Sequence, residues 1–343
     1  MAAPDIAGML MLLRTAQGRT QGELAAAAGM SQGLLSKAET GAVELDNGRL
    51  EALASALAVP LERLTAESPP RTVLSACAFH RKRSNLSVSD AKRIRALLDL
   101  TRMQVEPLVS ADAPPLQLGR ESPTGDGMIS PEDIARDVRA RFSVSGGPLP
   151  NLVAEVEAIG VLVVGRHLGT AHLDAVGSWP EGRRPMFLVS NEAPADRRRF
   201  TLAHELGHAV MHPRPVEEQE QEADRFASEL LMPASDIRGD LARLSLARLA
   251  DLKAAWRVSM AALLRRARDV GAISHYEYRR LNIEMSTAGY RTKEPVTISG
   301  ENPRLVTDTV SRRLGAGNSL ADLARVTGQL ESEFVSVYGG ESS

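Results

Sequence analysis

Apolar positions in the first 66 residues follow helical spacing and are interrupted by short breaks at glycine. This pattern predicts one short helix over residues 21–27, a turn at Gly29 and a second helix that opens at Ser31. The candidate core consists of apolar residues spaced as in packed helices: Leu24, Ala25, Leu34, Leu35, Leu50, Leu53, Leu57 and Leu61. We therefore predict a small all-α domain with a helix-turn-helix over residues 1–66.

Changes in composition divide the rest of the chain into four segments. Residues 67–108 predict a helical connector with a basic bias, and residues 109–129, rich in Pro, Gly, Asp and Ser, predict a flexible linker. Residues 130–235 mix helical and strand patterns, which predicts an α+β domain with a small sheet. The pattern of residues 236–343 is mostly helical, so we expect a multidomain protein with a helical C-terminal region.

The α+β segment has a predicted order of two helices, three strands and two further helices. Ser130 is a good N-cap for the first helix, with Pro131 in its first turn and Asp133 at the third position. The other predicted elements are a helix at 152–158, strands at 161–165, 171–179 and 184–190, a helix around His204, and a helix at 217–231 ended by Pro233.

Overall composition narrows the class of protein. Of the 343 residues, 43% are hydrophobic and 24% charged, as in ordinary globular proteins, and a net charge of −2 gives no global reason to expect nucleic acid. Cys77 is the only cysteine, which excludes an intramolecular disulfide and a zinc cluster built from cysteines. No apolar stretch reaches the length that spans a bilayer, so we expect a cytoplasmic protein without a membrane partner.

The segment Thr201-Leu-Ala-His-Glu-Leu-Gly-His208 carries an HExxH motif. His204 and His208 lie one helical turn apart on the same face, so both imidazoles can bind one ion. Glu205 is placed to act on water at the metal without binding the metal itself. Apolar neighbours on this helix predict a buried side, and Gly207 allows a neighbouring backbone to approach closely. The motif predicts a hydrolytic zinc site.

A third ligand is available about a dozen residues downstream. Glu220 and Asp224 are i, i+4 partners on the next predicted helix. Glu220 can complete a set of two histidines and one glutamate, while Asp224 can accept a hydrogen bond from a ligand imidazole and fix its tautomer. Glu217 and Glu218 are the reserve candidates, and an acidic, solvated helix start is the plain structural alternative for this cluster.

The other histidines are weaker candidates. His212 lies one further turn along the same face, too far along a straight helix to share the ion, so a surface or capping position is expected. His167, His172 and His275 are interpreted as ordinary loop or strand residues, and His172, on a predicted strand edge, is also a candidate for lining a substrate groove.

Two separated motifs carry a resemblance to a known family. The stretch RRRFTLAHELGHAVMH, followed by EADRFASELLMP, resembles the ImmA/IrrE family of metallopeptidases over roughly residues 130–233. The resemblance implies a zincin-like fold and a zinc ion, with manganese as an alternative, held by His204, His208 and Glu220, and Glu205 as general base. It also implies a regulatory protease that cuts a partner transcriptional repressor at one site.

The N-terminal module resembles the XRE (lambda-repressor-like) domain. The family pattern matches at Thr20-Gln21, Leu24-Ala25, Ala28-Gly29, Ser31, Ser36, Glu39 and Gly41. The resemblance implies that Gln21 meets a phosphate of double-stranded DNA and that Ser31, Gln32 and Lys37 meet bases. The helical pattern itself turns Ser31, Gln32, Ser36 and Lys37 outward from the second helix.

Local charge complicates the DNA reading. Residues 5–62 hold four basic and seven acidic residues, a poor balance for neutralising phosphates. Residues 71–102 hold eight basic residues against two Asp, and Arg81, Lys82 and Arg83 are their densest part, either a DNA clamp or a solvated helix face. Gly33 also places a bare backbone where the family usually has a side chain. A later two-helix pattern at 249–273 is interpreted as packing around Trp256 and Leu263.

Three hypotheses follow for the function. The first is a homodimeric DNA-binding transcriptional regulator that is also a zinc endopeptidase and cleaves a repressor or antitoxin-like protein. The second is a non-catalytic regulator or antitoxin that keeps the peptidase fold as a sensor or interaction domain; Glu205 argues against it, because a structural zinc site needs no base beside its ligand. The third is a protease whose helix-turn-helix docks a protein instead of DNA.

Overall fold

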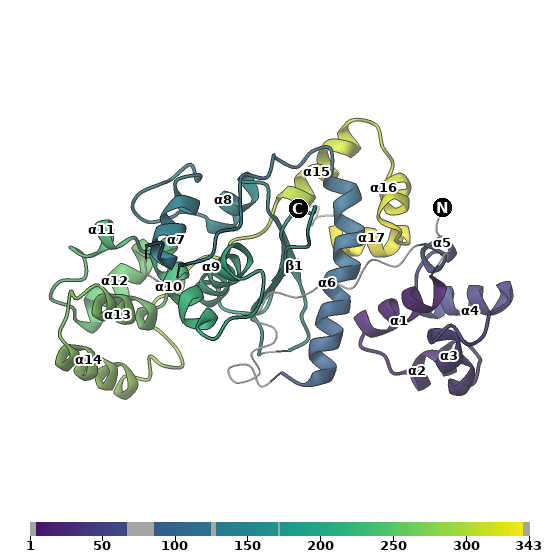
Figure 1. Cartoon of the computed structure of the whole chain (residues 1–343), viewed down its shortest axis with the longest axis horizontal. Helices are drawn as coiled ribbons and strands as arrows, with labels where there is room; N and C mark the ends of the chain where they lie inside the picture. The colour runs from purple at the N-terminus through teal and green to yellow at the C-terminus, as the bar shows by residue number, and fades with distance from the viewer. Residues whose placement is uncertain (1–4, 67–85, 125–127, 171, 339–343) are drawn as a thin grey trace. The chain divides into compact units, whose positions relative to one another are not determined.

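The computed structural model describes residues 5–66, 86–124, 128–170 and 172–338, which are drawn as ribbons in Figure 1. Contacts along the chain group these residues into two compact units. Unit 1 contains the described parts of residues 1–73, 85–113 and 304–343, and unit 2 contains those of residues 114–303. The five segments inferred from composition remain a prediction about domains, whereas this grouping describes which residues pack together.

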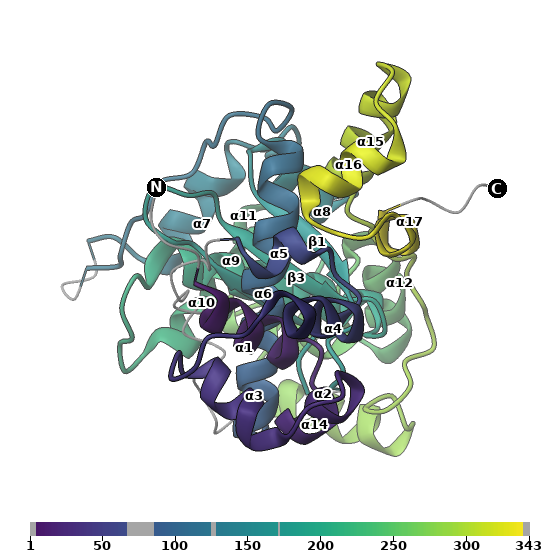
Figure 2. The same ribbon diagram turned by 90° about the vertical axis from the view of Figure 1, so that its right-hand side faces the viewer.

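The secondary-structure elements among the described residues of unit 1 are all helices. Its helices are α1 (Ile6–Ala16), α2 (Gln21–Ala27), α3 (Gln32–Glu39), α4 (Asn47–Leu57), α5 (Leu61–Leu64), α6 (Val88–Val109), α15 (Leu305–Gly315), α16 (Leu320–Thr327) and α17 (Glu331–Tyr338). The long helix α6 packs against α1 and against the C-terminal helices α15 and α16, so residues distant in sequence share one unit (Figure 2).

The predicted helix-turn-helix is confirmed by α2 and α3. Thr20 caps α2 in a capping box with Glu23, and Ser31 caps α3 by accepting a hydrogen bond from the Leu34 amide at 3.3 Å. Gly29 makes the turn with φ +65°, a left-handed conformation that glycine adopts without strain. Six of the predicted core residues are buried, namely Leu24, Ala25, Leu35, Leu50, Leu53 and Leu57, while Leu34 and Leu61 are half-buried.

Unit 2 is the α+β part of the chain. Its elements are α7 (Pro131–Arg139), α8 (Leu152–Ala158), β1 (Leu162–Arg166), β2 (Ala175–Ser178), β3 (Met186–Ser190), α9 (Ala195–Met211), α10 (Gln219–Leu231), α11 (Ala234–Ile237), α12 (Leu246–Trp256), α13 (Met260–Asp269) and α14 (His275–Thr287). All three predicted strands and the helix at 152–158 are therefore confirmed. Ser130 caps α7, and Asp133 closes the capping box in the place that glutamate usually takes.

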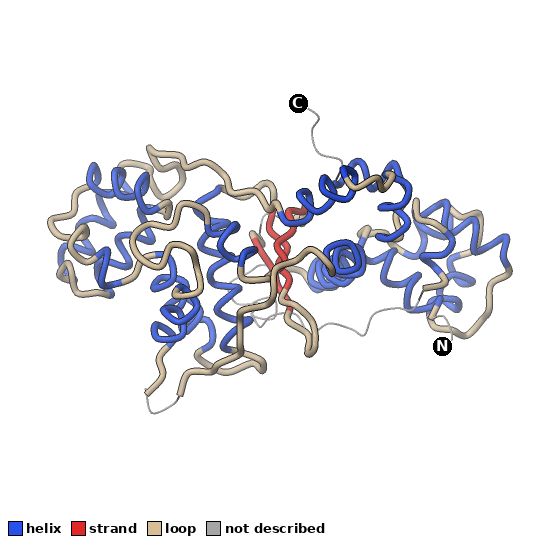
Figure 3. The backbone as a smooth tube through the Cα atoms, turned by 90° about the horizontal axis from the view of Figure 1, so that it is seen from above, coloured by secondary structure: helices blue, strands red, loops and turns tan. Residues whose placement is uncertain are grey.

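The sheet of unit 2 has the strand order β1-β3-β2. β3 pairs in parallel with β1 and antiparallel with β2, so that Leu188 lies opposite both Val164 and Val176. The helices of this unit lie on one side of the three strands (Figure 3). α9 packs on β2 and β3, and α10 packs on α9 and α7, which places the helix with the HExxH motif between the sheet and a second helix.

Part of the segment predicted as a linker is held against unit 2. The Gln117 amide donates to the Ile159 carbonyl at 2.9 Å, and the Glu121 amide donates to the Val210 carbonyl at 3.1 Å. Leu116 and Leu118 pack on the core of the unit. This part of the segment is therefore an extended strap and not a free linker. It is held in place because its backbone amides donate to carbonyl groups of α8 and α9.

Helices α12 and α13 pack as predicted around two apolar side chains. Trp256 and Leu263 are both buried, and Ser259 caps α13. Among the described residues, none of the helices combines the length and the apolar character needed to cross a bilayer.

Candidate metal centre and DNA-reading face

Helix α9 presents its motif toward the interior of unit 2. Leu202, Ala203, Leu206 and Val210 are buried and anchor the helix in the core. A Cβ added at Gly207 would lie 2.9 Å from Cδ1 of Phe226, so the glycine makes room for an aromatic ring on α10. The sequence predicted close approach of a backbone at this position; the close neighbour is instead a side chain. This contact sets how near α10 comes to the motif.

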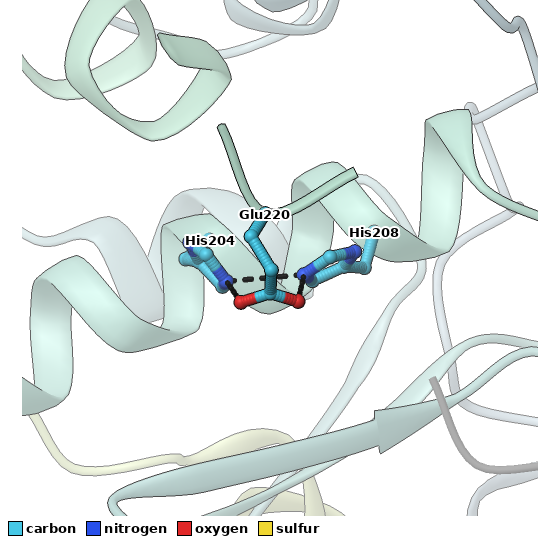
Figure 4. A group of neighbouring side chains, drawn as sticks. All are labelled: His204, His208 and Glu220. Atoms are coloured by element: carbon cyan, nitrogen blue, oxygen red, sulfur yellow. Dashed lines mark hydrogen bonds and ion pairs between the residues drawn. The ribbon is translucent and has the colours of Figure 1, made fainter. Parts of the chain in front are cut away.

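Two imidazoles and one carboxylate converge between α9 and α10 (Figure 4). The Nε2 atoms of His204 and His208 lie 3.0 Å apart. The carboxylate of Glu220 faces both rings, with Oε2 3.7 Å from Nε2 of His204 and Oε1 3.3 Å from Nε2 of His208. Two imidazole nitrogens and a carboxylate oxygen form a donor set of known catalytic zinc sites, so these residues fit a zinc ion.

The reserve candidates are placed elsewhere. Glu217 and Glu218 are exposed and precede the first turn of α10, whereas Glu220 is half-buried and directed at the histidines. Among the described residues, the group that brings potential ligand atoms within 4.8 Å of one another is His204, His208 and Glu220.

Asp224 lies one turn after Glu220 and faces the outer side of the first histidine. Its Oδ1 is 3.0 Å from Nδ1 of His204. This arrangement leaves Nε2 of His204 directed toward Glu220 and His208, which is the orientation that a metal ligand needs. Burial alone would lower the pKa of His204, but hydrogen bonds with Asp224 and Glu220 raise it to about 9. Burial likewise opposes the shift at Glu220, whose pKa is nevertheless lowered by its hydrogen bonds with both rings.

His212 takes the capping position that the sequence offered as one of two alternatives, but its contacts with a neighbouring imidazole and a carboxylate were not predicted. It is the C-cap residue of α9, but it is buried and not on the surface. Its Nδ1 lies 3.0 Å from Nδ1 of His208, and its Nε2 lies 2.8 Å from Oε2 of Glu222. Burial lowers the pKa of His212, against the opposing effect of Glu222. Two features of the sequence could have predicted these contacts. His212 continues the H-x3-H-x3-H spacing, and Glu222 follows Glu220 by two residues.

Glu205 is fully buried and lies close enough to His204 to raise the pKa of that ring electrostatically. Three further histidines among the described residues lie outside α9 and α10 in the sequence. His167 is exposed, with its Nδ1 2.8 Å from Oε1 of Glu192. His172 is exposed in the turn before β2, and His275 opens α14.

The outward face of α3 carries the residues expected to read DNA. Gln32 and Lys37 are exposed and Ser36 is half-buried, while the Ser31 hydroxyl is engaged as the helix cap. Arg81, Lys82 and Arg83 lie outside the described residues.

Gln21, which the resemblance assigns to a phosphate, has an internal partner in this structure. Its Nε2 donates to Oε2 of Glu39 at 2.8 Å, and Nη2 of Arg14 donates to the same oxygen at 2.8 Å. Arg19 donates to the Ala56 carbonyl at 2.5 Å. Nη1 of Arg49 lies 3.4 Å from Oδ2 of Asp46, so three of the four basic side chains of the module have partners within it.

The fold and the converging side chains define a protein with a helix-turn-helix DNA-binding domain and a metallopeptidase-type domain. Comparison with family models identifies both. Residues 156–268 match the model of the M78 peptidase family described as IrrE N-terminal-like domain, and residues 10–64 match the model described as Helix-turn-helix. The chain is a fusion of an XRE-type domain with an IrrE-like domain, as the sequence resemblance implied. A search of curated proteins finds no match.

Proposed function

We propose that this chain is a transcriptional regulator with zinc-dependent endopeptidase activity, which binds double-stranded DNA as a homodimer and cleaves a repressor or antitoxin-like protein. The observation that carries the proposal is the convergence of His204, His208 and Glu220 on one point. A buried carboxylate, Glu205, lies directly beside the first of these residues. This set of residues serves hydrolysis better than it serves structure, because a structural site needs no base.

Each residue has a distinct part in the proposed reaction. His204, His208 and Glu220 would hold zinc, which when bound supplies a Lewis acid that polarises a carbonyl and activates water. Glu205 accepts the proton of the attacking water and passes it to the leaving amine. Asp224 accepts a hydrogen bond from Nδ1 of His204, which directs Nε2 of that ring inward as the nitrogen that would bind the metal.

Metal analysis and one substitution test the enzyme. The purified protein should contain one zinc, or one manganese if that is the resident metal, and His204→Ala should lose it. Incubation with repressors encoded beside this chain should give one cut, mapped by mass. Glu205→Gln should keep the metal and slow cleavage by about 10²- to 10⁴-fold, the usual contribution of a general base. Metal content that does not change in His204→Ala would reject the site.

The burial of the site favours one alternative, a non-catalytic regulator or antitoxin that uses the peptidase fold as a sensor or interaction domain. The side chains of His208 and Glu205 have no exposed surface, so a protein substrate reaches them only if the site opens. Under this alternative, Glu205→Gln leaves repression in cells unchanged, whereas the enzyme proposal predicts that the substitution blocks the regulatory response.

The charge of unit 1 favours a second alternative, in which the helix-turn-helix docks a protein. Acidic residues outnumber basic ones in residues 5–62, and Arg14 and Arg19 have internal partners. A DNA duplex-binding assay at several salt concentrations distinguishes DNA binding from protein docking. Binding to DNA weakens with salt along a negative log–log slope. Neutralising Arg81, Lys82 and Arg83 should flatten that slope if they form a clamp, and should leave it unchanged if they are a solvated face.

A further inference from the structure

The two histidines of the proposed metal centre differ in what holds their outer ring nitrogens. Nδ1 of His204 meets a carboxylate, Asp224, directly at 3.0 Å. Nδ1 of His208 meets another imidazole, His212, also at 3.0 Å, and that imidazole in turn meets Glu222 at 2.8 Å. Both series of hydrogen-bond contacts end on a carboxylate of α10, about one turn or less from Glu220.

In the longer series of contacts, from His208 through His212 to Glu222, the two imidazoles are shielded from solvent and the carboxylate is half-buried. The His208 side chain has no exposed surface, that of His212 keeps 1%, and that of Glu222 keeps 18%. Polar atoms in such surroundings need hydrogen-bond partners, because water is not available to replace them. The contacts of His212 therefore constrain its ring from both sides.

For neutral imidazoles, one arrangement of protons satisfies every contact from His208 to Glu222. The ionised carboxylate of Glu222 accepts a hydrogen bond from Nε2–H of His212. Nδ1 of His212 then carries a lone pair and accepts a hydrogen bond from Nδ1–H of His208. Nε2 of His208 is left with its lone pair facing His204 and Glu220, as a metal ligand requires.

We propose that His212 and Glu222 are positioning residues for His208. They fix the tautomer and the ring orientation in which Nε2 of His208 binds the metal, and so do for the second ligand what Asp224 does for the first. This inference rests on the proposed function, because it requires an ion at the centre. Both nitrogens of His212 are engaged, one with His208 and the other with Glu222, so His212 itself is not a ligand.

A pair of isosteric substitutions separates positioning from packing. Oδ1 of asparagine takes roughly the place of Nδ1 of histidine, whereas Nε2 of glutamine takes roughly the place of Nε2. His212→Asn therefore keeps an acceptor for His208, and His212→Gln keeps only a donor for Glu222. Zinc affinity, measured by competition with a chelator, should fall about 10- to 100-fold in His212→Gln. In His212→Asn it should fall by a smaller factor.

Two further variants complete the comparison of affinities. Glu222→Ala removes the terminal acceptor and should also weaken zinc binding. Val210→Ala is the matched control, because it removes buried apolar atoms from the same helix without touching an imidazole. It should lower the melting temperature of the metal-free protein and leave zinc affinity within about twofold of wild type.

Nitrogen-15 spectra of the ring nitrogens in the zinc-loaded protein give a direct readout. His204 and His208 should carry the proton on Nδ1, and His212 should carry it on Nε2. In Glu222→Ala the His212 pattern should change to a mixture of tautomers.

The outcomes separate this inference from the proposed function. If wild type binds zinc and all His212 variants bind it equally well, or if His208 carries its proton on Nε2, the positioning role is wrong and the metal centre stands. If wild type and variants alike bind no zinc, both proposals fall together. If Val210→Ala weakens zinc binding as much as His212→Gln does, the effect is one of packing and the positioning role is also rejected.

Discussion

The helix-turn-helix and the metal centre are each built from two helices that follow one another in the sequence. Their polar residues, however, face opposite surroundings. On α3 the residues expected to meet DNA, Gln32 and Lys37, face solvent. On α9 and α10 the polar residues face one another, and His208 and Glu205 are completely buried. A surface that reads a partner is completed only by that partner, whereas a buried centre must satisfy its polar groups within the chain.

This difference decides how much the structure adds to each motif. At the metal centre the distances select Glu220 and reveal the chain from His208 to Glu222. In the helix-turn-helix the best-defined polar cluster, formed by Arg14, Gln21 and Glu39, is an internal anchor. The residues of α3 that are expected to meet DNA are exposed, so a DNA-binding experiment is the test of their role.

The largest expected effect comes from removing that anchor. Glu39 is buried and accepts hydrogen bonds from both Arg14 and Gln21. Glu39→Ala leaves a largely buried arginine without its acid, and should lower the free energy of unfolding of the helix-turn-helix by about 3 kcal/mol. Hydrogen exchange of the α1–α3 amides measures this, with the exposed Glu51→Ala as control. Zinc affinity should stay unchanged, and its loss would show that the two regions are coupled.

Two glycines sharpen the comparison because they have opposite surroundings. A Cβ at Gly207 would press on the buried ring of Phe226, so Gly207→Ala should destabilise unit 2 by about 1–3 kcal/mol and weaken zinc binding. A Cβ at Gly33 meets no atom within 4 Å, so Gly33→Ala should stabilise α3 by up to about 1 kcal/mol through helix propensity. Denaturant unfolding checks both; equal effects would contradict the packing argument.

Zinc and protons should compete for the ring of His204, so the zinc affinity of the buried centre should depend on pH. Because the pKa of His204 in the metal-free protein is about 9, zinc must displace a proton from this ring below that pH. Zinc affinity should rise about tenfold per pH unit up to pH 9 and then level off. Chelator competition at several pH values measures the slope, and a flat profile below pH 9 would contradict the assignment.

The same raised pKa affects the metal-free protein. Protonation of His204 contributes to the free energy of unfolding. This contribution is fully present below the ordinary histidine pKa of 6.5 and is lost as the pH rises through about 9. The melting temperature of unit 2 without metal should therefore fall across that interval. A rising melting temperature there would reverse the sign and reject the assignment.

The smallest expected effect concerns the DNA-reading face. Lys37 is exposed on α3, and its contact with one phosphate or base adds little free energy at physiological salt. Lys37→Ala should reduce the slope of log affinity against log salt by about 0.9 if the lysine meets a phosphate. Fluorescence anisotropy with a duplex measures this slope. A base contact would instead change affinity for one sequence with the slope retained.

The sequence by itself determined the elements and the core of the metal centre. Helical periodicity and caps located the helix-turn-helix and α8, and short apolar runs bounded by turn residues located the three strands, since these signals act over a few residues. The spacing of His204 and His208 fixed their shared face because one helical turn is a local property. The same i, i+4 logic ranked Glu220 above Glu217 and Glu218.

Only the tertiary structure decided which side chains meet across helices. The packing of Phe226 on Gly207 sets the approach of α10 to α9, and this approach brings Glu222 to His212. It also decided that α15 and α16 pack on α6. Just beyond the end of α6, Asp112 accepts a hydrogen bond from Arg313 of α15, which is 201 residues later in the sequence. Local patterns carry no information about helix crossing, which depends on the shapes of side chains far apart in sequence.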